Sequence, residues 1–329
     1  MMLHRRNLLA LGTALAAPAL IPAAARAQAT FPREPIRLVV PFSPGGPTDI
    51  PARLIADELS KMLPQRVIVE NRTGAGTVIG ADAVAKAAKD GHTLLYTTIA
   101  QAAIRAIYPS LPFDPVKDFQ PVALTGTIPM LLMVNKDVPA NSLQELIALF
   151  KKEPGEYDYA STGSGAALHL ASELFLKQAG GLKVNHIPYR GSAAAMPDVL
   201  NGTVAMMLDV ANSGLPFVRE GSVKALAISS KQRLPQLPDV PTFDEAGVPG
   251  YEAYTWHMVL APAGTPQPVV AQLNEAINKV MAMDSVKARL SDLTMTTRSD
   301  STPDSTRKWL TDEIAKWEPV IKEAGIKAD

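Results

Sequence analysis

Residues 36–63 read IRLVVPFSPGGPTDIPARLIADELSKML and carry the strongest structural signal in the chain. An apolar strand pattern over Ile36–Phe42 leads into the loop Ser43–Asp49, and a helical pattern with Leu54 and Leu59 on one face follows. A helix N-terminus carries unpaired N–H groups and about half a positive charge, so it attracts anions. In an open α/β sheet, ligands bind beyond the carboxyl ends of the strands, where this loop falls. The loop is therefore expected to be either a plain turn or an anion-binding loop.

A second stretch repeats this design later in the chain. The strand pattern Tyr157–Ala160 leads into Ser161–Gly165 (STGSG), and a helical pattern through Leu168 follows. The hydroxyls of this loop suit a carboxylate ligand, although Ser164 alone would also fit a helix cap. His169, about one turn into the helix, either packs locally or contacts the ligand. Two such loops predict a jaw that closes on a carboxylate.

The composition is that of an ordinary globular chain. Of 329 residues, 47% are apolar and 19% are charged, and the formal net charge is zero. A chain of this length exceeds the size at which a single core stops growing, so two domains are expected. The balanced charge argues against nucleic acid as a partner, because phosphate binding needs a basic face. The sequence contains no cysteine, which excludes disulfides, thiolate chemistry and Cys-based metal sites.

The N-terminus has the pattern of an export signal. Arg5 and Arg6 precede an apolar run over Leu8–Leu20, and Ala25–Ala27 fits the small-x-small rule for cleavage. We expect residues 1–27 to be a signal peptide and the protein to be periplasmic. The arginine pair resembles a twin-arginine signal but also occurs in Sec signals, so the export route stays open. A membrane anchor is the alternative, although the apolar run is short for a bilayer span.

Beyond this signal, strand and helix patterns alternate, which is typical of parallel βαβ units and predicts an α/β fold. Strand-rich sequence without a long helix interrupts the alternation near Pro121–Asn135, and Trp256–Leu260 is a second crossover-like stretch. We expect a discontinuous first domain of residues 28–127 and 251–329, a second domain of residues 128–250, and hinges at Met130–Val134 and Trp256–Leu260. Expected strands are residues 36–42, 66–70, 92–98, 122–124, 130–134, 157–160, 183–187, 204–209 and 224–229. Expected helices are residues 49–63, 77–88, 143–152, 166–178, a short one from 192, 267–283 and 303–324.

Three further loops are candidates for the cleft between these domains. Gly74-Ala75-Gly76 imitates a dinucleotide fingerprint, but the next strand ends at Thr97-Thr98, where an acid for the ribose should lie. A cleft-lining loop, with Thr98 beside it, is the better interpretation. Arg190, next to Tyr189, either pairs with a carboxylate or is a solvated charge. Asp209 either accepts a ligand hydroxyl or ammonium group, or caps the helix after it.

Catalytic and metal chemistry have little support in the sequence. Gly163-Ser164-Gly165 lacks the first glycine of a nucleophile elbow, because Thr162 stands two residues before the serine. His169 and Glu173 have the i, i+4 spacing of metal ligands, but two ligands without a third are a weak signal. We expect no metal, no cofactor and no enzymatic activity. An exported hydrolase that pairs Ser164 with a remote histidine stays as the alternative.

Eight motifs are distributed over almost the whole chain after the signal. They are IRLVVPFSPGG-x-TD (36–49), VENR-x-GAG (69–76), DG-x-TLL (90–95), PVKDF (115–119), LHLA-x-ELF (168–175), PY-x-G (188–191), LPDVPT (237–242) and LAPAGTP (260–266). Together they resemble the Bug-type solute-binding proteins, the extracytoplasmic receptors of tripartite tricarboxylate transporters.

The resemblance implies a two-domain Venus-flytrap receptor with the topology of type II periplasmic binding proteins. Such a receptor holds a small carboxylate by loop amides, hydroxyls and ordered waters, and passes it to the membrane subunits of the transporter. A sensor kinase is the alternative partner, and we expect the receptor to be a monomer.

Two departures from the family pattern bear on the choice of carboxylate. Pro47 stands where a third glycine is common, and Gln101–Arg105 replace a His-Ala-Ile-Asn-Pro run. Whether Gln101 and Arg105 contact the ligand stays open. The expected ligand-binding residues are Gly45, Gly46, Thr48, Asp49, Gly74, Ala75, Gly76, Thr98, Gln101, Ser161, Thr162, Gly163, Ser164, Gly165, His169, Tyr189, Arg190 and Asp209.

Overall fold

The computed structural model describes residues 31–108 and 110–327, and the predicted signal peptide over residues 1–27 lies outside them. From Pro32 onward the chain forms one compact unit. Its ten-stranded sheet has the order β2-β1-β3-β9-β4-β7-β5-β6, with β8 and β10 each paired to β4. Among these described residues, no helix combines the length and the apolar character that a bilayer span requires.

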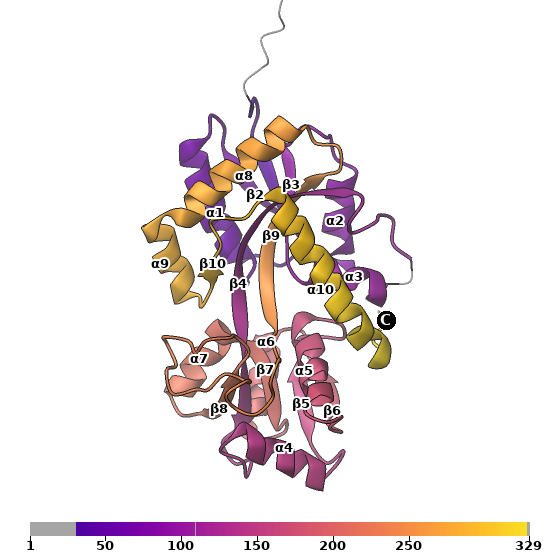
Figure 1. Cartoon of the computed structure of the whole chain (residues 1–329), viewed down its shortest axis with the longest axis vertical. Coiled ribbons are helices and arrows are strands. Elements are labelled where there is room, and N and C mark those ends of the chain that lie inside the picture. The colour runs from indigo at the N-terminus through magenta and orange to yellow at the C-terminus, as the bar shows by residue number, and fades with distance from the viewer. Residues whose placement is uncertain (1–30, 109, 328–329) are drawn as a thin grey trace, which may run out of the picture. The chain divides into compact units, whose positions relative to one another are not determined.

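Parallel strands form the centre of what we call the first lobe. β1 pairs in parallel with β2 on one side and with β3 on the other, so the three carboxyl ends lie at one edge of the sheet. Helices follow each strand and cover the sheet, as parallel sheets require. The elements of this lobe are β1 (Ile36–Val40), α1 (Asp49–Met62), β2 (Val67–Asn71), η1 (Ala75–Thr77), α2 (Val78–Ala85), β3 (Thr93–Thr97) and α3 (Ala100–Ile107) (Figure 1).

The second lobe repeats this arrangement. β5 pairs in parallel with β6 on one side and with β7 on the other, and a helix follows each of the three strands. Its elements are α4 (Leu143–Lys152), β5 (Asp158–Ser161), α5 (Ala167–Gln178), β6 (Asn185–Pro188), α6 (Ser192–Asn201), β7 (Met206–Val210), α7 (Ala211–Arg219) and β8 (Val223–Ile228) (Figure 1).

Two long strands, β4 (Phe119–Asn135) and β9 (Tyr254–Pro262), join the two lobes. They are antiparallel to each other up to the pair Pro129 and Tyr254, and from Met130 onward β4 pairs with β7 and β8 instead. Ser229 fixes this exchange of partners, because its hydroxyl accepts from Met130 N at 2.7 Å and donates to Ala253 O. The predicted domain boundaries at residues 127–128 and 250–251 fall close to this exchange and stay a prediction.

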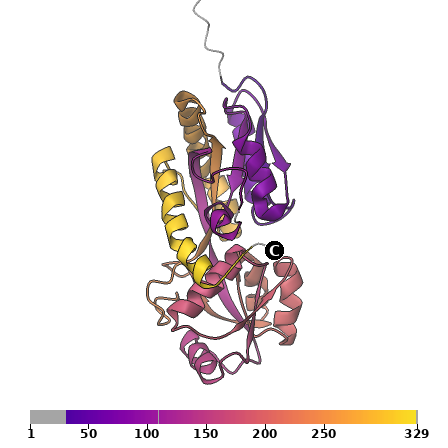
Figure 2. The ribbon, with the colours of Figure 1, turned by 90° about the vertical axis from the view of Figure 1, so that its right-hand side faces the viewer.

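The C-terminal segment packs against both lobes. It contains α8 (Gln267–Ala282), α9 (Asp284–Asp292), β10 (Thr296–Thr297) and α10 (Pro303–Glu323). α10 contacts α3 in the first lobe and α5 in the second. Figure 2 shows it, in yellow, running along the first lobe until its end reaches the second. The carboxylate of Glu313 holds α10 to β9, since its Oε2 accepts from Trp256 Nε1 at 2.7 Å and from Trp317 Nε1 at 2.8 Å.

The predicted α/β fold is confirmed, and most predicted elements agree with the observed ones to within a few residues. The strands expected at residues 122–124 and 130–134 are one strand, β4, because the residues between them stay extended against β9. The prediction missed α3, α9 and β10, and it gave no bounds for α7. α3 has only eight residues and starts directly after Thr98 and Ile99, so its apolar periodicity is too short to separate it from a loop.

Replacing Glu313 with alanine should lower the free energy of unfolding by about 2–4 kcal/mol, because two buried indole N–H groups lose their acceptor. Both indoles are fully buried. Thermal denaturation of the purified protein measures this loss as a fall in Tm.

Glu275 provides the matched control for this change. It forms an exposed pair with Lys279 on the surface of α8, so Glu275→Ala should change stability by less than about 0.5 kcal/mol. Equal Tm values for Glu313→Ala and Glu275→Ala would contradict the assigned role of Glu313.

Candidate functional site

A cleft of about 630 Å³ lies between the lobes. In the first lobe, its lining comes from the loops that follow the carboxyl ends of β1, β2 and β3, and from α3. In the second lobe, it comes from the loops that follow β5, β6 and β7. Thr255 and His257 of the joining strand β9 complete the lining. Ligands of α/β proteins bind at such edges, so this cleft is the candidate site.

Six helices begin at this cleft, and the residue that caps the N-terminus of each one lines it. Within the described residues, none of these six helices has a side-chain hydrogen bond at its cap. Of the helices that begin away from the cleft, α4 and α10 are capped by the Ser142 and Thr302 side chains, whereas α8 and α9 have no side-chain cap in the described structure. The six cap residues are Thr48 of α1, Thr77 of α2, Ile99 of α3, Ala166 of α5, Gly191 of α6 and Val210 of α7.

The loop between β1 and α1 is shaped by its own acid. The buried Asp49 carboxylate accepts from Gly45 N at 2.8 Å, from Arg53 Nε at 2.8 Å and from Asn71 Nδ2 at 2.8 Å. Burial alone would raise the pKa of Asp49, but the hydrogen bonds from Arg53, Gly45 and Asn71 outweigh it and hold the pKa below its usual value. Asp49 and Gly45 do not line the cleft; they turn the loop so that Gly46 and Thr48 do.

The first turn of α1 also differs from the expectation of a fully open helix end. The carbonyl of Gly46 accepts from Asp49 N at 3.0 Å and from Ile50 N at 3.1 Å, and Pro51 has no N–H to offer. The helix dipole still points at the cleft, but these N–H groups are engaged within the loop.

Histidines hold the second loop, Ser161–Gly165, in the same way. The N–H of Gly165 donates to His169 Nδ1 at 2.9 Å, and the His169 ring stacks on His186 at a centroid distance of 3.8 Å. His186 Nε2 in turn lies 2.6 Å from Ser161 Oγ. Burial, and the neighbouring His186, lower the pKa of His169 to about 3. His169 is therefore a neutral acceptor behind the loop, and neither it nor Ser161 lines the cleft, whereas the other residues of the loop do.

The loop after β6 and the end of β7 contribute one basic and one acidic side chain to the cleft, Arg190 and Asp209. Arg190 is exposed, and of the described residues that line the cleft it is the only one with a permanent positive charge. Asp209 is fully buried; its Oδ1 accepts from Ser192 Oγ at 2.8 Å and from Val210 N at 2.7 Å. Its Oδ2 has no hydrogen-bond partner in the described part of the chain. Burial raises the pKa of Asp209 to about 6. Tyr189 is turned away, with its hydroxyl donating to Asp198.

Gln101 and Arg105 of α3, which belong to the run that departs from the family pattern, lie outside the cleft lining. Gln101 is fully buried and donates from Nε2 to the Pro115 carbonyl at 2.9 Å. Arg105 forms an ion pair with Asp114. Both therefore support the position of α3, whose cleft-facing side is apolar, with Ala103 and Ile104 among the lining residues.

The cleft thus brings together ten of the predicted site residues and leaves eight outside its lining. Those that line it are Gly46, Thr48, Gly76, Thr98, Thr162, Gly163, Ser164, Gly165, Arg190 and Asp209. Those outside are Gly45, Asp49, Gly74, Ala75, Gln101, Ser161, His169 and Tyr189.

Several lining residues were not among those predicted. His257 is the most unusual, because it is 1% exposed and neither ring nitrogen has a hydrogen-bond partner in residues 31–108 and 110–327. Its ring stacks on Tyr96 at 5.2 Å, and burial lowers its pKa to about 3. Ser43 lies within the motif of residues 36–49 and Ser192 directly follows the motif of residues 188–191, so both could have been included on that ground. The other polar additions are Thr77, Tyr108 and Thr255.

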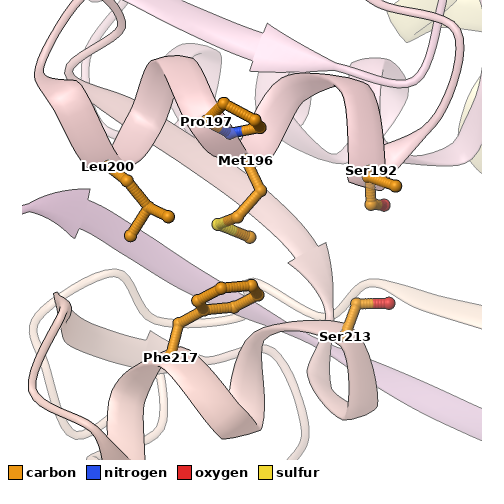
Figure 3. A pocket seen from close by; sticks show the side chains of 7 residues that line it. Ser192, Met196, Pro197, Leu200, Ser213 and Phe217 are labelled. Carbon is orange, nitrogen blue, oxygen red and sulfur yellow. The ribbon is translucent and has the colours of Figure 1, made fainter.

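A second cavity, of about 410 Å³, lies between α6 and α7 in the second lobe. Figure 3 shows the Met196 side chain pointing towards the Phe217 ring, with Leu200 on one side and the hydroxyls of Ser192 and Ser213 on the other. This lining is mostly apolar and its polar side chains are two serines, so it offers a carboxylate fewer donors than the large cleft does. Ser192 also lines the large cleft.

Replacing Asp209 with asparagine should remove a pH-dependent loss of stability. The pKa of this carboxyl is about 4 in an unfolded chain and about 6 in the fold. The fold therefore disfavours the ionised form, so the wild type loses roughly 2–3 kcal/mol from this group as the pH rises from about 4 to about 7. Asparagine keeps the acceptor for Ser192 and cannot ionise.

The measurement is the free energy of unfolding of both proteins between pH 4 and pH 8. His169 and His257 change stability in the opposite direction, since their lowered pKa values favour the fold as the pH rises, but both proteins share them. The difference between the two curves should grow in favour of Asp209→Asn up to about pH 7. A difference that does not vary with pH would show that Asp209 is not a buried acid.

The chain was compared with known proteins. Residues 51–326 match the family described as tripartite tricarboxylate transporter family receptor. The chain is 40% identical over 300 residues to Protein BugT of Bordetella pertussis, covering 91% of each chain. Among solved structures, the periplasmic binding protein BugD is 34% identical with a TM-score of 0.78, covering 91% of this chain and all of that one.

Two other similar structures contain a bound acid. An R. palustris protein solved with adipate is 36% identical with a TM-score of 0.80, over 91% of this chain and 100% of that chain. MatC from Rhodopseudomonas palustris, solved with bound malate, is 36% identical with a TM-score of 0.77, over 88% of this chain and 100% of that chain. The chain therefore belongs to the receptor family of the tripartite tricarboxylate transporters, the Bug-type solute-binding proteins, and has their two-domain periplasmic-binding-protein fold.

Proposed function

We propose that this protein is an exported receptor that captures a small organic carboxylate in the cleft between its lobes and delivers it, unchanged, to a tripartite membrane transporter. The observation that carries this proposal is the convergence of six helix N-termini, without side-chain caps in the described structure, on one cleft. Helix N-termini favour negative charge. The adipate and malate of the related structures are acids of the size that such a cleft accepts.

Hydrogen bonds supply enough free energy for this binding without a dedicated ion pair. A micromolar Kd corresponds to about 8 kcal/mol. Hydrogen bonds to a charged group contribute roughly 1.5–3 kcal/mol each, so four or five of them suffice after the cost of immobilising the ligand. The cleft offers the hydroxyls of Thr48, Thr98, Thr162 and Ser164, and the glycines of both loops allow a close approach to the backbone.

Closure of the lobes would complete the site. We infer that residues 28–127 and 251–329 move against residues 128–250, with β4 and β9 as the connection. Support comes from the exchange of strand partners between Pro129 and Met130. Closure would expel water and strengthen each hydrogen bond to the ligand. The closed form is then the state that a membrane partner distinguishes from the open one.

The remaining parts of the proposal concern the setting of the receptor. We propose export by the signal over residues 1–27, a monomeric receptor, and the membrane subunits of the transporter as partners. A sensor kinase is the alternative partner, and it would bind the same closed form.

A hydrolase would need a base beside Ser164. His169 lies in the first turn of α5, behind this loop, but its Nδ1 accepts from Gly165 N and its Nε2 lies 3.9 Å from Glu173 Oε1. These contacts hold the loop in place, which favours the receptor.

A thermal-shift screen tests the proposal directly. The panel consists of malate, adipate, citrate, glutamate, nicotinate and benzoate. A ligand present at 100 times its Kd should stabilise the receptor by about 2.7 kcal/mol, which corresponds to a rise in Tm of roughly 5–10 °C. A wild-type protein whose Tm none of these acids raises would contradict the proposed function.

Gly46→Asp should abolish this rise in Tm without unfolding the protein. A Cβ at Gly46 would meet only Ser43 O at 3.4 Å, an ordinary contact, so the loop can accept a side chain. The new carboxylate would repel an anionic ligand at the start of α1.

Gly46→Asn is the matched control, since asparagine has the same size without the charge. It should retain more of the rise in Tm than Gly46→Asp does. An unchanged rise in Gly46→Asp would remove this loop from the binding site, and equal losses in both variants would make the effect steric.

A further inference from the structure

We propose that Thr77, which lies outside the predicted site residues, donates its hydroxyl to a carboxylate oxygen of the bound ligand. The proposal rests on the proposed function, because it assigns a contact within that same cleft. Three independent observations point to it: the backbone conformation of Thr77, the state of its hydroxyl, and its position on the cleft wall.

The backbone around Thr77 is strained. Gly74, Ala75, Gly76 and Thr77 have φ values of 126°, 43°, 56° and 87°. Glycine adopts such values freely, but a β-branched residue at positive φ is a true outlier. Strain of this kind persists only where the surroundings enforce it, and it clusters at functional sites.

The hydroxyl of Thr77 has no role within the fold. Thr77 is the N-cap of α2, where a threonine normally accepts from a backbone N–H of the first turn, yet it makes no such bond. Its side chain is buried, with the residue 6% exposed, and Oγ1 has no hydrogen-bond partner among the described residues. A buried hydroxyl without a partner is destabilising. The residue thus contributes neither a relaxed backbone nor a satisfied hydroxyl to the free protein.

The position of Thr77 indicates which group its hydroxyl binds. Thr77 lines the cleft on the same wall as Ser43, Thr48 and Thr98, which stand at the carboxyl ends of the neighbouring strands. A row of hydroxyls on a wall to which helix N-termini point is suited to the oxygens of a carboxylate.

The strained loop is also held firmly. Tyr108 covers it, because a Cβ on Gly76 would lie 2.2 Å from the Tyr108 hydroxyl oxygen. Tyr108, which also lines the cleft, therefore packs directly against the loop beside Thr77.

The experiment separates the hydroxyl from the strain. The probe is the acid of the panel above that raises the wild-type Tm most, and its Kd is measured by calorimetry. Thr77→Val keeps the β-branched shape and removes the hydroxyl, so the Kd should rise about tenfold or more. Thr77→Ser keeps the hydroxyl and should stay within about threefold of the wild type.

A glycine variant tests the backbone strain at Thr77. Thr77→Gly should raise the Tm of the free protein by about 2 °C or more, since it relieves the positive φ, while its Kd rises as in Thr77→Val. Thr73→Val is the matched control for Thr77→Val, because it removes a hydroxyl from an exposed threonine close to the same loop and outside the cleft lining. Its Kd should equal that of the wild type.

The outcomes distinguish the two proposals. A wild type that binds an acid of the panel, together with a Thr77→Val variant that binds it equally well, would overturn the role of Thr77 and leave the receptor function intact. A lower Tm in Thr77→Gly would overturn the strain on which the inference is built. A wild type that binds none of the acids would overturn both.

Discussion

The structure depends on the direction in which its helices point. Each lobe is built on parallel strands, and each helix that follows such a strand starts at the carboxyl edge of the sheet. β4 and β9 join the lobes so that these two edges line one cleft. Six helix dipoles therefore act on the same space, each with about half a positive charge at its N-terminus. This arrangement follows from the chain topology, so it does not require charged side chains.

The side chains of the cleft fit this interpretation. Burial lowers the pKa of His257 in the cleft lining and raises the pKa of Asp209, so both groups are pushed towards their neutral forms. A fixed ion pair buried in a cleft would carry a large desolvation penalty when the ligand leaves. Backbone dipoles and hydroxyls are already oriented, so their desolvation penalty is smaller than that of an ion pair. The receptor can thus attract an anion and still release it.

The local parts of this design could be predicted from sequence, and the distant parts could not. The loops Ser43–Asp49 and Ser161–Gly165 were recognised because strand, loop and helix start are adjacent in the chain. Asp49 and His169 show the limit of that reasoning, since both were expected at the ligand but bind their own loops instead. Sequence spacing cannot tell whether a side chain faces a ligand or a neighbouring amide. His257 was missed because it reaches the cleft only through the pairing of β9 with β3 and β4.

Several buried polar groups that line the cleft have no hydrogen-bond partner within the described part of the chain. Polar groups buried away from the cleft can be fully used: Asn135 donates to the carbonyls of Val199 and Leu200 and accepts from Asp137 N. In the cleft lining, by contrast, Thr77 Oγ1, Asp209 Oδ2 and both nitrogens of His257 lack partners among the described residues. Each such group lowers the stability of the free protein. Thr97 Oγ1, Gln101 Oε1 and Thr294 Oγ1 outside the lining also lack partners in the described structure, so it is the position of Thr77, Asp209 and His257 in the cleft that makes their free atoms available to a ligand.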